Sequence, residues 1–70
     1  GKNVIDLDGP DGNANYLMGI GGNFLKRNLG WTKEEVGDFY TEMMAGDYEN
    51  LLLVFDKYLG DYFDLHRTLK

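Results

Sequence analysis

The chain has 70 residues and a net charge of −5, from 12 acidic and seven basic residues, which places its pI near 4.5. This length predicts one small domain over residues 1–70. The apolar fraction of 43% and the ten aromatic residues (four Phe, five Tyr, one Trp) are enough for a folded core, so wholesale disorder is not expected.

Composition also removes several classes of function. The chain has no cysteine and a single histidine, His66, which excludes disulfides, thiolate catalysis and Cys- or His-cluster metal sites. Its basic residues are scattered, so we expect no direct nucleic-acid binding and no binding to an anionic membrane surface. No apolar run approaches the ~20 residues that cross a bilayer, and no signal-peptide pattern is visible. We expect a cytoplasmic protein without a cofactor.

The first predicted element is a short strand over residues 3–8, with Ile5 and Leu7 on one side. It must end in the turn Gly9-Pro10-Asp11-Gly12. A helix is expected from about residue 13 to about residue 29, with Asp11 or Asn13 as its N-cap and Gly30 after its end.

Three glycines interrupt this helix, at positions 19, 21 and 22. Each interior glycine disfavours a helix by ~1 kcal/mol relative to alanine, so the helix could kink or break there. The other interpretation is close packing, in which the missing side chains let another backbone or an aromatic ring approach.

Two further helices have clear boundaries. Thr32 and Glu35 form a capping box, and the helix that follows should end at Gly46. Asp47 caps a third helix, which should end at Gly60. Residues 62–66 then alternate as a second strand.

The simplest assembly of these elements is an α+β fold with the order β-α-α-α-β. The N- and C-terminal strands would pair, and three helices would cover their apolar face. The sequence does not fix the strand direction, and we predict an antiparallel pair.

The polar turn after the first strand is the first candidate site. Asp8, Asp11 and Asn13 could hold a hard cation, but no EF-hand register fits, because Pro10 or Leu17 falls where a ligand is required. The favoured interpretation is a helix cap; a rigid recognition loop is the third option.

No catalytic set is visible. The 19–24 segment lacks the third glycine of a dinucleotide-binding turn and the Lys-Ser/Thr of a P-loop. His66 lies near Asp61 and Asp64, but the chain has no serine or cysteine to serve as a nucleophile. We therefore predict that the protein is not an enzyme.

Exposed apolar side chains are the remaining candidates. Trp31, Tyr40, Met44 and Leu53 could form a partner-binding patch, since methionine adapts to irregular partners and aromatic residues anchor interfaces. The same patch, or an unpaired strand edge, could form a homodimer. The alternative to a binding role is that these are single exposed apolar residues of the ordinary kind.

Three strings carry a resemblance over nearly the whole chain. Asp-Gly-Pro-Asp-Gly-Asn-Ala at 8–14 and Glu-Met-Met-Ala-Gly-Asp-Tyr-Glu-Asn-Leu-Leu at 42–52, followed by Leu-Gly-Asp at 59–61, resemble a group of small uncharacterised proteins from bacteriophages and bacterial accessory elements. The resemblance implies a genetic context in which small acidic proteins often bind a host protein. It implies no activity and no functional residue.

The function predicted from these observations is stoichiometric binding to another protein, as a phage- or mobile-element-encoded modulator. One alternative is an acidic mimic of DNA that occupies a basic groove. It would use carboxylates gathered near the paired strands, namely Asp6, Asp8, Asp11, Asp61 and Asp64. The other alternative is a divalent-cation-binding domain that uses the 6–13 loop.

Overall fold

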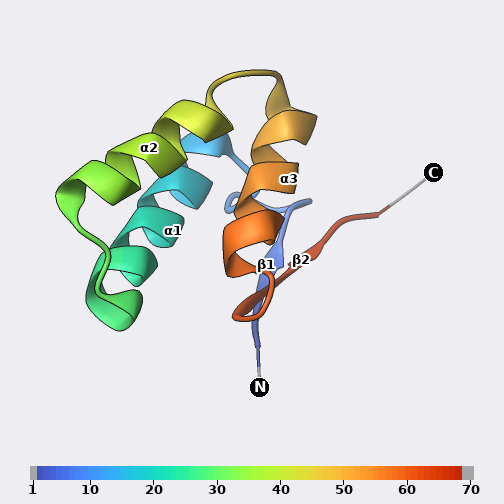
Figure 1. Cartoon of the computed structure of the whole chain (residues 1–70). Helices are drawn as coiled ribbons and strands as arrows, with labels where there is room; N and C mark the ends of the chain where they lie inside the picture. The colour runs from blue at the N-terminus through green and yellow to red at the C-terminus, as the bar shows by residue number, and fades with distance from the viewer. Residues whose placement is uncertain (1, 69–70) are drawn as a thin grey trace.

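The computed structural model describes residues 2–68 and confirms the α+β order β-α-α-α-β (Figure 1). The elements are β1 (Asn3–Asp6), α1 (Ala14–Leu29), α2 (Lys33–Met43), α3 (Tyr48–Leu59) and β2 (Phe63–His66). The two strands lie side by side at one side of the helical layer, with α3 nearest to β2 (Figure 1).

The strands are parallel, so the predicted antiparallel pair is wrong. The register aligns Asn3 with Phe63 and Asp6 with His66. Figure 1 shows why the direction is the same: the chain turns back at each connection from β1 through α1, α2 and α3 to β2. With three helices between the strands, these reversals return the chain to the starting end of the sheet. A helical crossover of this kind is what parallel strands require.

β1 is shorter than predicted and ends at Asp6, because the turn begins inside the predicted strand. The Asp6 carboxylate accepts the Asp8 N–H at 2.9 Å, and the Asp6 carbonyl accepts the Gly9 N–H at 3.3 Å. The predicted apolar face is nevertheless confirmed: Ile5 is buried and Leu7 packs against the core.

α1 runs unbroken through its glycines, so the close-packing interpretation is confirmed. A Cβ on Gly21 would lie 3.1 Å from the rings of both Phe39 and Phe55, and a Cβ on Gly22 would overlap the Tyr40 phenol. The glycines therefore let α1 approach α2 and α3 closely. This gain in packing outweighs their low helix propensity.

The predicted caps are confirmed, and the structure selects Asn13 over Asp11. The Asn13 side chain accepts the Tyr16 N–H at 2.8 Å. Both bonds of the capping box are present, from the Glu35 N–H to Thr32 Oγ1 at 3.1 Å and from the Thr32 N–H to Glu35 Oε1 at 2.8 Å. Asp47 caps α3.

The helix ends differ in mechanism. Gly30 has a φ of 69°, as expected for a left-handed residue after α1. α2 ends at Met43, three residues before the predicted Gly46. Neither Gly46 nor Gly60 has a positive φ, so neither acts as a left-handed cap.

The core lies between the three helices and the inner face of the sheet. Phe39 of α2 and Phe55 of α3 are its largest fully buried side chains. Phe63 of β2 meets Phe55 at 5.6 Å and Phe24 of α1 at 5.1 Å, both edge-on. These aromatic contacts join the sheet to the helices.

Candidate functional site

The side chains of the predicted polar turn are used by the chain itself. Asn13 caps α1 and also donates to the Pro10 carbonyl at 2.7 Å. The Asp8 carboxylate accepts both the hydroxyl and the N–H of Thr68, at 2.7 and 2.8 Å. These bonds hold the pKa of Asp8 below its ordinary value. Asp11 is exposed.

Within residues 2–68, no group of three His, Asp or Glu side chains is placed to hold a metal ion. The carboxylate of Asp8 and the amide of Asn13 already have hydrogen-bond partners in the chain. This arrangement favours the capping interpretation of the turn over a cation site.

The predicted aromatic anchors are half-buried packing residues. The Trp31 ring meets Tyr58 edge-on at 5.5 Å, and the Tyr40 ring lies 5.8 Å from Phe39, over Gly22. Both side chains pack against the core, so much of their surface is already covered.

Met44, directly after α2, and Leu53 of α3 are the two most exposed large apolar side chains among the described residues, at 62% and 71%. They do not share a surface. Met44 borders a hollow of about 340 Å³ with Met18, Tyr48 and Leu51. Leu53 borders a different hollow, on the side of α3 that faces β2. The structure therefore divides the predicted patch instead of assembling it.

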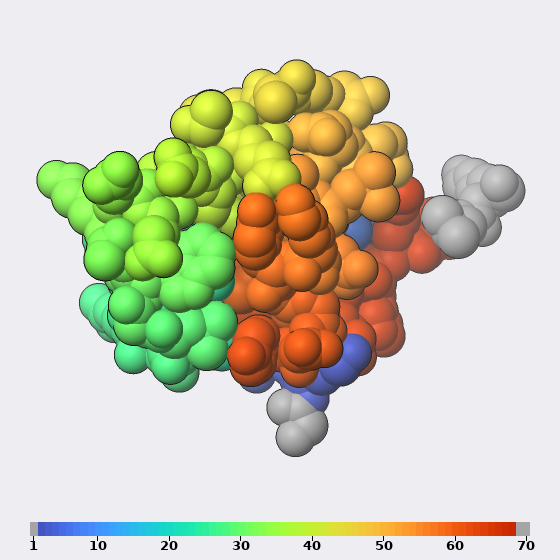
Figure 2. All heavy atoms as spheres, in the orientation of Figure 1, coloured from blue at the N-terminus to red at the C-terminus, as the bar shows by residue number. Residues whose placement is uncertain are grey.

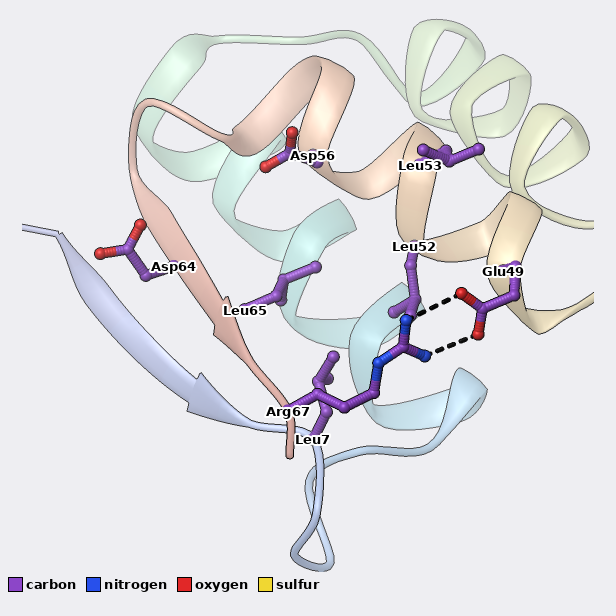
Figure 3. Close-up of a pocket in the computed structure, with 8 residues that line it drawn as sticks. All are labelled: Leu7, Glu49, Leu52, Leu53, Asp56, Asp64, Leu65 and Arg67. Carbon is purple, nitrogen blue, oxygen red and sulfur yellow. Dashed lines mark hydrogen bonds and ion pairs between the residues drawn. The ribbon is translucent and has the colours of Figure 1, made fainter. Parts of the chain in front are cut away.

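The hollow beside Leu53 is a groove of about 410 Å³ between α3 and β2, which we call the α3–β2 groove (Figure 3). The side chains that line it are Leu7, Glu49, Leu52, Leu53, Asp56, Asp64, Leu65 and Arg67. The space-filling view shows the molecule hollowed between α3 and the C-terminal segment, with atoms of the N-terminal segment at the base (Figure 2).

α3 supplies one wall of this groove through residues 49, 52, 53 and 56, whose spacing places them on one face of the helix. Leu52 and Leu53 are the apolar middle of that wall, and Glu49 and Asp56 are its acidic ends. Leu65 supplies apolar surface from β2. The result is a groove whose lining is half leucine and half charged, with carboxylates in excess.

An ion pair closes one end of the groove. Arg67 Nη1 and Nη2 donate to the two carboxylate oxygens of Glu49 at 2.6 and 2.9 Å, as the dashed lines in Figure 3 show. This fork-to-fork pair lowers the pKa of Glu49 and raises the pKa of Arg67.

The other end of the groove is left with excess negative charge. Figure 3 places Asp56 and Asp64 away from the Arg67 end. Within residues 2–68, the one ion pair of Asp64 is a long one, with Lys2 at 3.5 Å. Asp56 has no ion pair among the residues that the structure describes. A basic group would be attracted to this end.

A second groove, of about 460 Å³, lies between β1 and α1. Its apolar surface comes from Tyr16, Ile20 and Phe24, and its charged lining residue is Arg27. The two sides of the sheet thus carry grooves of similar size but opposite charge.

Leu53 is the predicted site residue that lines the α3–β2 groove. The other lining residues were missed, namely Leu7, Glu49, Leu52, Asp56, Asp64, Leu65 and Arg67. The periodicity of α3 could have identified the helical wall. Nothing local in the sequence places β2 beside it, because that depends on the parallel register.

No protein-family model, no curated protein and no solved structure matches the chain. The resemblance to small phage and accessory-element proteins therefore stays a prediction. Among the described residues, no helix has the length and apolar character needed to cross a membrane.

Proposed function

We propose that the protein acts by stoichiometric binding to another protein, without catalysis, and that the contact is centred on Leu53. The observation that carries this proposal is a leucine that is 71% exposed at the mouth of a groove lined by leucines and carboxylates. Apolar groups surrounded by polar rims are typical of protein interfaces. The resemblance adds that the partner would be a host protein of a phage or mobile element.

The two alternatives have less support. A DNA mimic needs free carboxylates along one face, whereas Asp6 and Asp8, two of the carboxylates it would use, accept hydrogen bonds from the chain itself. A cation-binding loop needs free oxygen ligands, and the 6–13 turn uses its own for capping and turn formation.

The proposal is tested with two matched surface variants, Leu53→Asp and Met44→Asp. Both side chains are exposed, so both variants should fold, which circular dichroism would verify. Each protein is immobilised and exposed to lysate, and recovered proteins are quantified by mass spectrometry. The expected result is a protein that wild type and Met44→Asp retain and Leu53→Asp loses.

A retained protein is then purified and mixed with the chain. A complex of fixed stoichiometry, measured by light scattering, supports the proposal. If wild type and Leu53→Asp recover the same proteins in equal amounts, the proposal is wrong.

A further inference from the structure

We propose that the α3–β2 groove binds an extended segment of the partner as an added strand on β2. Apolar side chains of the segment would face Leu53 and Leu65, and a lysine or arginine would lie beside Asp56 and Asp64. This inference rests on the proposed function and specifies its site and the chemistry of the partner.

The first argument is the unpaired backbone of β2. The Tyr62 carbonyl accepts the Asn3 N–H at 3.0 Å, and the His66 carbonyl accepts the Leu7 N–H at 2.7 Å. In a parallel ladder alternate residues face the partner strand, so the even-numbered residues of β2 face β1. The N–H and C=O groups of Phe63 and Leu65 therefore point to the other edge. Outside the β1–β2 ladder, no backbone hydrogen bond to these groups exists within residues 2–68.

The second argument is the position of the groove relative to that edge. Leu65 is on the inner face of β2 and Asp64 is on the outer face, yet both line the groove. A hollow lined from both faces lies alongside the strand, not beneath the sheet. An added strand would occupy this place, with its inward side chains against Leu52 of α3 and with Leu53 at the outer margin (Figure 3).

The third argument is charge. Three carboxylates line the groove, and its one guanidinium is already bound to Glu49. The surplus lies at Asp56 and Asp64, and the net charge of −5 has the same sign. A second copy related by a two-fold axis would bring identical carboxylates to the same edge and be repelled. A basic segment would be attracted, so the occupant is a basic, apolar strand of another protein.

The test uses a peptide with an acetylated N-terminus and an amidated C-terminus. Lysines at its N-terminal end are followed by a strand-forming segment of about six residues in which Ile or Val alternates with Thr. One control peptide replaces each lysine with glutamate. A second control carries N-methyl groups on alternate residues, which removes edge N–H donors but keeps the side chains. Binding is followed by ¹H–¹⁵N NMR titration of the intact chain.

The lysine peptide should shift the amide signals of Phe63, Leu65 and Arg67 and slow hydrogen exchange at Leu65. The N-methylated and glutamate peptides should bind much more weakly. Asp56→Asn combined with Asp64→Asn should weaken binding by about threefold to tenfold, and Asp38→Asn, on the exposed face of α2, should not.

Several outcomes overturn the inference. Equal binding of the N-methylated peptide would exclude strand addition, and no shift at these amides would exclude this edge. If the amide signals of β2 shift with protein concentration in the absence of peptide, and Leu53→Asp removes these shifts, the edge binds a second copy of the chain. If Leu53→Asp still abolishes partner capture in these cases, the proposed function survives; if capture never depends on Leu53, the proposed function itself fails.

Discussion

Two glycine residues determine how closely the helices meet. Gly21 of α1 faces Leu59 and the rings of Phe39 and Phe55, and Gly22 faces Tyr40. Gly19, in the same helix, has no neighbour within 4 Å of the position its Cβ would take. Gly21 and Gly22 are therefore required for close packing, whereas Gly19 is not. Substitution by alanine distinguishes the two cases.

Gly21→Ala should destabilise the protein by about 1–3 kcal/mol, because the added methyl group overpacks a filled core. Gly19→Ala should stabilise it by up to about 1 kcal/mol through helix propensity. Urea unfolding followed by circular dichroism measures both changes. A stabilising Gly21→Ala would contradict the packing described for α1.

Asn13→Ala should cost about 1 kcal/mol of stability, because the Tyr16 N–H loses its acceptor. Asp11→Ala is the matched control in the same turn and should change the unfolding midpoint little. Equal losses in the two variants would mean that Asn13 is not the cap in solution.

At this scale the sequence was enough to predict local caps, but not the contacts that distant residues make. It predicted the Thr32–Glu35 capping box, whose two partners are three residues apart. It left Asp11 and Asn13 as alternatives for the cap. It also could not decide between a kink and close packing at Gly21, because the rings that fill the space come from α2 and α3.

At the scale of the elements, a polar contact joins α2 to α3. Glu42 of α2 accepts from Lys57 Nζ at 2.8 Å and from the Tyr58 hydroxyl at 2.6 Å, both on α3. These two hydrogen bonds hold the pKa of Glu42 below its ordinary value, and the bond from Lys57 has the larger effect. The contact therefore stabilises the folded state more when Glu42 is ionised than when it is protonated.

A carboxyl whose pKa is depressed by folding contributes stability above its unfolded pKa and loses it as the pH falls through the folded value. Glu42→Gln should therefore unfold at lower urea than wild type at pH 7, and this difference should shrink below about pH 4. Asp38→Asn, exposed on α2, is the control. A difference that stays constant down to pH 3 would contradict this role of Glu42.

The elements themselves were largely predictable, because their signals are local. Caps and apolar spacing located three helices and two strands, and β1 differed only where Asp6 starts the turn early. The strand direction was not predictable from composition or periodicity. It depends on how many times the chain reverses between β1 and β2.

At the scale of the whole molecule, the parallel register makes a specific prediction for hydrogen exchange. The amides of Asp64 and His66 face β1 and should exchange slowly, whereas the amide of Leu65 faces the open edge and should exchange fast. Exchange followed by NMR in deuterated buffer measures this alternation. Slow exchange at Leu65 in the free protein would mean that the edge is already occupied.

The candidate site was less predictable than the fold, because its residues are brought together by the pairing of distant strands and not by local sequence. Leu53 was identified from the apolar pattern of α3, but its neighbours Leu65 and Arg67 come from the far end of the chain. Conversely, Trp31 and Tyr40 are aromatic residues that the sequence could equally place inside or outside. Tertiary packing covers much of both.

The pairing of the first strand with the last also has a consequence during synthesis. The ribosome releases residues 3–6 long before residues 63–66 exist, so β1 must wait for its partner while the helices form. During this interval Val4 and Ile5 are an unmatched strand in the nascent polypeptide. We expect translation pauses before residues 63–66 are made to leave this strand exposed to chaperones.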